Sequence, residues 1–323
     1  MLGESDLVLW TVTLLWAALT GIGIPWLGMR MLVPTLVTSD RIVTNYRGRE
    51  VALGLGLVWA LWLGGVLVFF AGTTYAWLLG DLPALGRAGG PLDFAVTLVG
   101  GAFVFGLIDD MFGSSAERGF RGHLGALAKG RLTTGGLKLL GIGLISLLGG
   151  AHMTLAERLT VGSAIHGLAA AAVLALAANT LNLFDLRPGR ALKVYTLLAA
   201  VGLVALALSL LGPGAVAAGV LGEIGVVALF CLGPLLAVWR FDLGEAGMLG
   251  DAGANGLGMW IGIIFVVALP PAGTVLLALA LFALNLASER VSFSSVIEQN
   301  RGLSAIDQWG RQREVSRIAD TTE

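Results

Sequence analysis

The chain has 323 residues, of which 56% are hydrophobic and 13% are charged, and its formal net charge is −1. Soluble domains carry about 25% charged residues, so this composition excludes a soluble globular class. A near-neutral chain also lacks the basic footprint of a nucleic-acid-binding protein, and we expect no nucleic-acid partner. The single cysteine, Cys231, excludes an intramolecular disulfide and a cysteine-rich metal site.

Apolar runs that are long enough to cross a bilayer recur along the whole chain. Because about 20 residues make one span, the pattern predicts an all-α fold, a polytopic transmembrane helix bundle of about nine spans, with ten as the alternative. The first run lacks a basic leading segment and a clear cleavage site, so we expect a retained helix. The expected spans are 7–31, 51–79, 93–108, 134–150, 161–182, 191–211, 215–239, 254–269 and 273–288.

The distribution of basic residues predicts the orientation, because cytosolic loops are rich in Lys and Arg. With the 32–50 loop in the cytosol, eighteen of the twenty Lys and Arg residues fall on the cytosolic side, and only Arg87 and Arg158 fall on the other. We therefore expect a multi-pass plasma-membrane protein with its N-terminus outside and its C-terminus in the cytosol. Residues 1–288 form the expected transmembrane catalytic domain.

Residues 289–323 form an expected cytosolic amphipathic tail. Its apolar positions are spaced by three or four residues over much of its length, which is typical of a helix that lies in the membrane interface. Membrane lipid is therefore an expected partner of the chain.

Two adjacent acids, Asp109 and Asp110, close the apolar run 93–108. Acids at the edge of hydrocarbon are costly, which favours a functional role over two solvated side chains. On a regular helix they diverge by about 100°, so the backbone must open for both to face one ion. Carboxylate oxygens suit Mg²⁺ that keeps several waters and phosphate oxygens.

Two later segments end or begin spans on the same membrane side. Asn179, Asn182 and Asp185 recur every third residue and share one broad helical face, with Arg187, Arg190 and Lys193 directly after them. Such a set favours a phosphorylated ligand, although an interhelical polar contact gives the same pattern. Asp251 stands in Gly-Asp-Ala-Gly before a helix, where metal or phosphate can approach the backbone. We expect the three segments to converge and to hold Mg²⁺ against a diphosphate.

Together these segments resemble the motifs of the polyprenyl-phosphate N-acetylhexosamine-1-phosphate transferases, which form glycosyltransferase family 4. The family's Asp-Asp pair matches Asp109-Asp110, its Asn-x-x-Asn-x-x-Asp matches Asn179–Asp185, and its Met-Gly-Asp-x-Gly matches 249–253. Its basic loop before the second helix is similar to 47–56, and a lysine that follows its acid pair corresponds to Lys138.

The resemblance implies transfer of a sugar-1-phosphate from a nucleotide sugar, UDP-linked in the family, to polyprenyl (undecaprenyl) phosphate, with release of UMP. It implies Asp251 as the principal Mg²⁺ ligand, with Mn²⁺ as an alternative ion, and Asp109 and Asp110 as catalytic groups that position the lipid phosphate. We also assign Asp110 to the metal. The expected substrate-binding residues are Asn179, Asn182, Asp185, Arg187, Arg190, Lys193, Arg47, Lys138, Asn255 and Arg301.

Two departures from the family pattern leave the sugar and the nucleotide open. Leu186-Arg187-Pro188-Gly189 replaces the family's Gly-Leu-Asp-Gly, and 289–298 replaces a histidine-rich motif. Two other classes remain as alternatives: a transporter or flippase, for which Glu223 within a span is the only hint, and a non-catalytic family member that binds lipid or nucleotide sugar. A homodimer also stays open.

Overall fold

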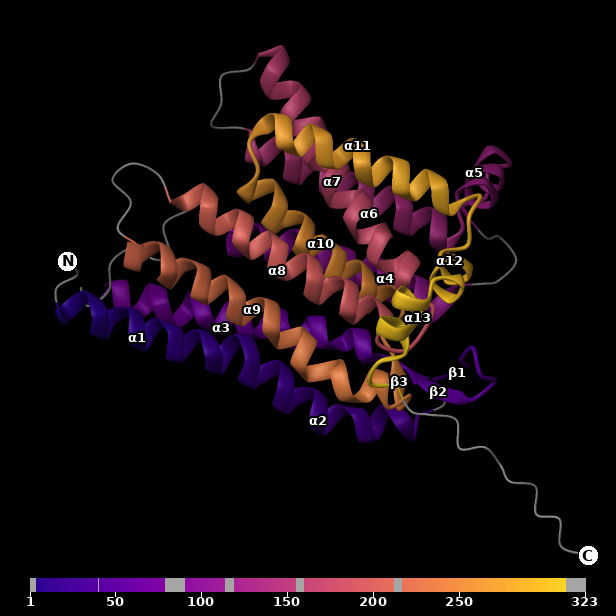
Figure 1. Ribbon diagram of the computed structural model, residues 1–323, viewed down its shortest axis with the longest axis horizontal. Coiled ribbons are helices and arrows are strands. Elements are labelled where there is room, and N and C mark those ends of the chain that lie inside the picture. The colour runs from indigo at the N-terminus through magenta and orange to yellow at the C-terminus, as the bar shows by residue number, and fades with distance from the viewer. Residues whose placement is uncertain are drawn as a thin grey trace, which may run out of the picture.

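The computed structural model describes residues 4–39, 41–78, 91–113, 119–154, 160–211 and 217–311. The described chain folds into a bundle of long helices with short elements at one end (Figure 1). The long helices are α1 Glu4–Ala18, α2 Ile24–Val37, α3 Val58–Leu78, α4 Pro91–Phe112, α6 Thr134–Met153, α7 Val161–Phe184, α8 Arg190–Leu210, α9 Ala217–Leu243, α10 Gly250–Ala268 and α11 Pro271–Ser288. The short helices are η1 Leu19–Gly23, η2 Leu55–Leu57, α5 Gly119–Ala128, α12 Phe293–Gln299 and α13 Arg301–Gln308.

Eight helical segments among the described residues are long and apolar enough to cross a membrane. They confirm the predicted all-α polytopic class. The span expected at 93–108 lies in α4, which is not among the eight, so the count of nine and the orientation stay predictions. Arg87, Arg158 and 312–323 of the expected tail lie outside the described residues.

Helix α10 forms the centre of the bundle and packs against α4, α7 and α8 (Figure 1). It is the most buried of the candidate spans. A helix that is surrounded by protein needs small or apolar side chains on all sides, and α10 is rich in Gly, Ala and Ile. Trp260 of α10 and the neighbouring Trp59 and Trp62 of α3 are fully buried, and the indole Nε1 of Trp59 donates to the carbonyl oxygen of Gly253 at 2.9 Å.

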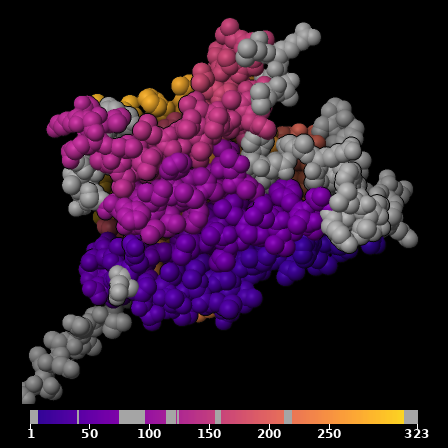
Figure 2. Space-filling model, turned by 180° about the vertical axis from the view of Figure 1, so that it is seen from behind, coloured from indigo at the N-terminus to yellow at the C-terminus, as the bar shows by residue number. Residues whose placement is uncertain are grey.

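Seen from behind, the molecule presents the N-terminal half of the chain, coloured from indigo to magenta (Figure 2). The later helices are visible there only at the edges. Because α4 and α6 lie on this side while α7, α8 and α9 lie toward the viewer of Figure 1, α10 is covered from both sides.

A small sheet that the sequence analysis did not predict lies at one end of the bundle. It contains β1 Ile42–Thr44, β2 Glu50–Leu53 and β3 Gly247–Met248; β1 and β2 are antiparallel, and β2 pairs in parallel with β3. The Asn45 side-chain oxygen accepts hydrogen bonds from the backbone N–H groups of Arg47 at 2.9 Å and Arg49 at 3.0 Å, and Gly48 has a φ of +74°. This Asn-x-x-Gly turn closes the hairpin.

The strands, α12 and α13 lie at the same end as the C-terminus of α4, the C-terminus of α7 and the N-terminus of α10 (Figure 1). The fold therefore brings the polar segments of the sequence analysis to one end of the bundle.

The contact between α4 and α10 yields a test of this packing. A Cβ at Gly106 would lie 2.6 Å from the carbonyl oxygen of Asp251 and 2.7 Å from the Cα of Ala252. We expect Gly106→Ala to destabilise the protein by about 1–3 kcal/mol, because backbone atoms cannot rotate away. Unfolding in mixed detergent micelles measures this change.

Gly143→Ala in α6 is the matched control, since a Cβ there meets no atom within 4 Å. Alanine is the better helix former, so the control should be neutral or stabilising. Equal stability of the two variants would contradict the described contact of α4 with α10.

Candidate functional site

Asp110, in the last turn of α4, caps the first turn of α10. Its carboxylate oxygens accept hydrogen bonds from the backbone N–H groups of Asp251 at 2.8 Å and Ala252 at 2.9 Å. The N-cap residue Leu249 has no side-chain acceptor, so a carboxylate from another helix satisfies donors that a helix start leaves free. Gly250 has a φ of +67°, and a Cβ there would lie 2.7 Å from the Asp110 carboxylate, so this position requires glycine.

Lys138, in the second turn of α6, joins two other carboxylates. Its Nζ lies 2.8 Å from Oδ2 of Asp109 and 2.5 Å from Oδ2 of Asp251. The three side chains are 12% to 25% exposed, so they are largely covered yet open to solvent on one side. Attraction between charges strengthens as water is displaced. The ends of α4, α6 and α10 are therefore held at a single point by one ammonium group and two carboxylates.

The structure places Asp109, Asp110, Asp251 and Lys138 close together, but the contacts differ from the prediction that Asp110 and Asp251 share an ion. Asp109, rather than Asp110, shares a cation with Asp251. Both oxygens of Asp110 accept backbone hydrogen bonds, which places this residue in the support of α10. Its roles as metal ligand and catalytic group stay predictions.

Asp185 ends α7 beside this cluster. Burial raises the pKa of Asp185 well above its usual value, and the negative charges of Asp242, Asp251 and Asp110 raise the pKa further. A hydrogen bond from the backbone N–H of Gly250 acts in the opposite direction. The Asp185 carboxyl therefore lies close to the acidic groups of α4, α9 and α10.

Asn179 of the same motif differs from the expectation of a shared binding face. The Asn179 amide nitrogen donates to Oδ1 of Asn285 in α11 at 2.6 Å, and the Asn285 amide donates to Oγ1 of Thr180 at 2.9 Å. These bonds join α7 to α11, which is the interhelical alternative for Asn179. Asn182 is half-buried. Substrate-binding roles for both residues stay predictions.

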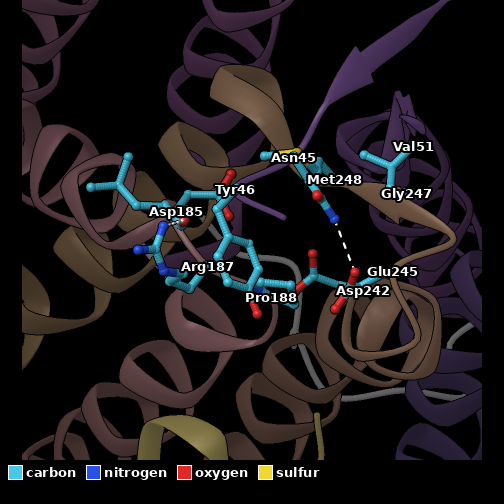
Figure 3. A pocket seen from close by; sticks show the side chains of 11 residues that line it. Asn45, Tyr46, Val51, Asp185, Arg187, Pro188, Asp242, Glu245, Gly247 and Met248 are labelled. Carbon is cyan, nitrogen blue, oxygen red and sulfur yellow. Dashed lines mark hydrogen bonds between the residues drawn. The ribbon is translucent and has the colours of Figure 1, made fainter. Parts of the chain in front are cut away.

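A small pocket lies next to Asp185, between the hairpin and the loop after α9 (Figure 3). Besides Asp185, its polar lining comes from Asn45, Tyr46, Arg187, Asp242 and Glu245. The Asn45 amide nitrogen donates to Oε2 of Glu245 at 2.9 Å, which Figure 3 shows as a dashed line. Carboxylates and amides in one pocket suit a ligand that carries several hydrogen-bond donors.

Arg187 connects the hairpin to the tail across this pocket. Its guanidinium carbon lies 4.3 Å from the ring centroid of Tyr46, a cation–π distance, and its NH2 lies 3.2 Å from Oε1 of Glu298. Because the Glu298 side chain is 56% exposed, this ion pair is weak and the guanidinium can exchange partners.

The two other cations that follow the motif, Arg190 and Lys193, form hydrogen bonds with the tail. Arg190, 3% exposed, donates from Nε and NH2 to the two carboxylate oxygens of Asp307 at 2.9 Å each. Lys193 Nζ donates to the Asp307 carbonyl oxygen at 2.7 Å, and Arg311 donates to an Asp307 carboxylate oxygen at 2.5 Å. These contacts attach α13 to the start of α8. The predicted substrate-binding roles of Arg190 and Lys193 therefore compete with a structural one.

Three further residues were predicted to bind substrate, and they lie apart from one another. Arg47 in the hairpin lies 3.1 Å from Oε1 of Glu245, which connects the basic loop to the pocket. Asn255, one turn after Asp251, is 1% exposed, and its amide nitrogen has no hydrogen-bond partner among the described residues. Arg301 is exposed at the start of α13.

Sequence reasoning missed Asp242, Glu245 and Tyr46. Asp242 is 3% exposed and accepts a hydrogen bond from the backbone N–H of Gly189 at 2.6 Å. Arg240-Phe-Asp-Leu-Gly-Glu245 at the end of an apolar run was a signal, since acids there resemble the Asp109-Asp110 pattern. Tyr46 stands inside the basic loop that was considered for its arginines alone.

The two carboxylates that contact Lys138 are ligands of a kind that a divalent cation binds. No cluster of three His, Cys, Asp or Glu side chains with metal-site geometry occurs within the described ranges. Asp109 and Asp251 nevertheless direct one oxygen each at a common point. Two carboxylates completed by water and phosphate oxygens are a ligand set that Mg²⁺ accepts.

Comparison with known proteins gave no match, either to a model of a protein family or to a curated protein. The functional argument therefore depends on the motifs and on the geometry described above.

The Asp307 contacts give a prediction for stability as a function of pH. Burial raises the pKa of Asp307, but the hydrogen bond from Arg190 and the charges of Arg311, Arg190 and Lys193 outweigh it, and the net pKa is lowered. A carboxyl with a lowered folded-state pKa stabilises the fold above its unfolded pKa of about 3.9, and this contribution declines as the pH falls through the folded-state value.

We expect Asp307→Asn to lower the free energy of unfolding by about 3 kcal/mol at pH 7, because it leaves buried arginines without their charge partner. Thermal unfolding of both proteins between pH 7 and pH 3 measures the difference. The difference should stay constant down to about pH 5 and shrink below about pH 4. A difference that is the same at both ends of the range would contradict the proposed charge state.

Proposed function

We propose that the chain transfers a sugar-1-phosphate from a nucleotide sugar to a polyprenyl phosphate at the cytosolic face of the plasma membrane. The observation that carries the proposal is the meeting of Asp109, Lys138 and Asp251 at the ends of three helices. The site lies where apolar helices end, so a lipid tail can stay in the bilayer while its phosphate reaches the charged groups. The motif resemblance supports the same reaction class.

In the proposed reaction an oxygen of the lipid phosphate attacks the β-phosphorus of the nucleotide sugar. A bond to the polyprenyl phosphate forms, the bond between the two phosphates of the donor breaks, and UMP leaves with the electron pair when the donor is a UDP-sugar. A phosphate monoester is already largely ionised at pH 7, because its second pKa is about 6. Positioning and charge neutralisation should therefore contribute more than a general base.

The chain's own residues have distinct parts in this proposal. Asp109 and Asp251 would hold Mg²⁺, whose bound charge would offset that of the diphosphate. Lys138 would then be released from one or both carboxylates, and its ammonium could donate to a phosphate oxygen. Asp110 keeps the start of α10 in place through its two backbone hydrogen bonds, so that Asp251 faces the reacting groups.

The proposal favours a transferase over a transporter because of where the acids lie. Transporters usually place ionisable groups near the bilayer midplane. Here Asp109, Asp110, Asp185 and Asp251 lie at helix ends. Glu223, in the first half of α9, lies on a helix that approaches the acidic cluster only at its other end.

The test uses purified protein with undecaprenyl phosphate, Mg²⁺ and a panel of nucleotide sugars, and it measures release of the nucleoside monophosphate. We expect turnover with at least one donor. Asp251→Asn should lower kcat at least about 100-fold, since it removes a charge that acts on the transferring phosphate. Chelation of Mg²⁺ should abolish turnover.

Glu223→Gln is the matched control, because it neutralises an acid on another part of the bundle and should leave turnover unchanged. Absence of turnover with every donor, or full activity of Asp251→Asn, would refute the proposal. Proton-coupled uptake into proteoliposomes that Glu223→Gln abolishes would favour the transporter instead.

A further inference from the structure

Helix α13 has three different sides. At about 100° per residue, Asp307 points to one side, Arg301 and Gln308 to a second, and Leu303, Ile306 and the C-cap residue Trp309 to a third. The first side is the buried ionic contact with Arg190 and Lys193. The other two sides differ sharply in polarity, although both are exposed.

Contacts from two sides place α13 against the cytosolic ends predicted for two spans. Asp307 binds the residue that begins α8, and the indole of Trp309 meets that of Trp239 in an edge contact with ring centroids 6.4 Å apart. Trp239 lies in the last turns of the candidate span Gly219–Leu243. Tryptophan is enriched where a bilayer meets water, because its ring is apolar and its N–H is polar.

The apolar side of α13 is uncovered. Leu303, Ile306 and Trp309 are 44%, 61% and 67% exposed, and Val296 in α12 is 45% exposed. These residues are continuous, through the contact of Trp309 with Trp239, with a span whose Leu236 is 45% exposed on the same helical face as Trp239. The exposed faces of the candidate spans are the faces that meet lipid.

We propose that α13 lies in the interface of the bilayer that the spans of this chain cross. Leu303, Ile306 and Trp309 then lie at the boundary between the lipid headgroups and the acyl chains. The occupant of this face is lipid rather than a second protein, because the face continues an exposed apolar surface of α9. Arg301 and Gln308 lie on the exposed polar side, which faces water in this arrangement.

This binding has a consequence for the pocket. Asp307 holds Arg190, and Arg311 Nε donates to the carbonyl oxygen of Pro188 at 2.8 Å. Pro188 and Arg187 line the pocket. A tail held by lipid on one side therefore fixes the turn that forms one pocket wall. The inference does not depend on the proposed transferase activity.

The test maps the surroundings of α13 in nanodiscs, where both membrane faces are open to solvent. Cys231 is the single cysteine and is buried, so Cys231→Ala gives a background for labelling. Ile306→Cys and Leu303→Cys each place an environment-sensitive fluorophore on the apolar side. Gln308→Cys, about 200° around the helix from position 306, is the matched control on the polar side.

We expect the label at 306 to be quenched by shallow doxyl lipids at least about twofold more than the label at 308, and iodide to show the reverse order. The label at 303 should follow the label at 306, which keeps the test valid if one variant does not fold. Equal iodide access at 306 and 308 would overturn the proposal. Protection of position 306 from both quenchers would also overturn it, because it would indicate a protein partner.

Discussion

The contact of Lys138 with Asp109 and Asp251 is the interaction on which the rest of this end of the bundle depends. Two carboxylates that approach one point repel each other unless a cation lies between them, and the repulsion grows as water is excluded. The three groups come from α4, α6 and α10, so no local sequence feature holds them together. Their approach requires that α4 and α10 pack closely, which the glycine at position 106 permits.

Two layers of contacts support this centre. The inner layer is Asp110, which fixes the start of α10 by accepting its first N–H groups. The outer layer joins segments from the two halves of the chain. Arg187 contacts Tyr46 in the hairpin and Glu298 in the tail, and Asp307 attaches α13 to α8. Segments that are distant in sequence thus enclose one pocket beside the acidic cluster.

The helical class followed from the sequence because a membrane span is defined by local composition. The sequence also led us to expect the ends of α4, α7 and α10 to converge, because their polar residues fall at span ends on one predicted side; Lys138 came only from the family resemblance. The hydrogen-bond partners of individual side chains could not be predicted from the sequence. Asn179 shares a helical face with Asp185, yet it bonds to Asn285 in another helix, and Arg190 has its partner 117 residues away.

The hairpin at 42–53 was missed for a different reason. Its strands have three and four residues, too short for an alternating pattern to stand out, and the signal lay in the turn around Asn45 and Gly48. The buried acids Asp242 and Glu245 were missed because the apolar run before them ended without a repeat of the motif. The pairing of the strands was tertiary information, because β2 is completed by β3, which lies almost two hundred residues later.

A double-mutant cycle between Lys138 and Asp251 tests the central contact most directly. The free energies of unfolding of Lys138→Gln, Asp251→Asn and the double variant are compared with that of the unmodified protein in the same detergent. The described geometry predicts a coupling energy above about 1 kcal/mol, because Lys138→Gln leaves two carboxylates without their cation, whereas Asp251→Asn leaves Lys138 with Asp109 alone. Additive effects to within about 0.5 kcal/mol would contradict it, since independent sites behave in that way.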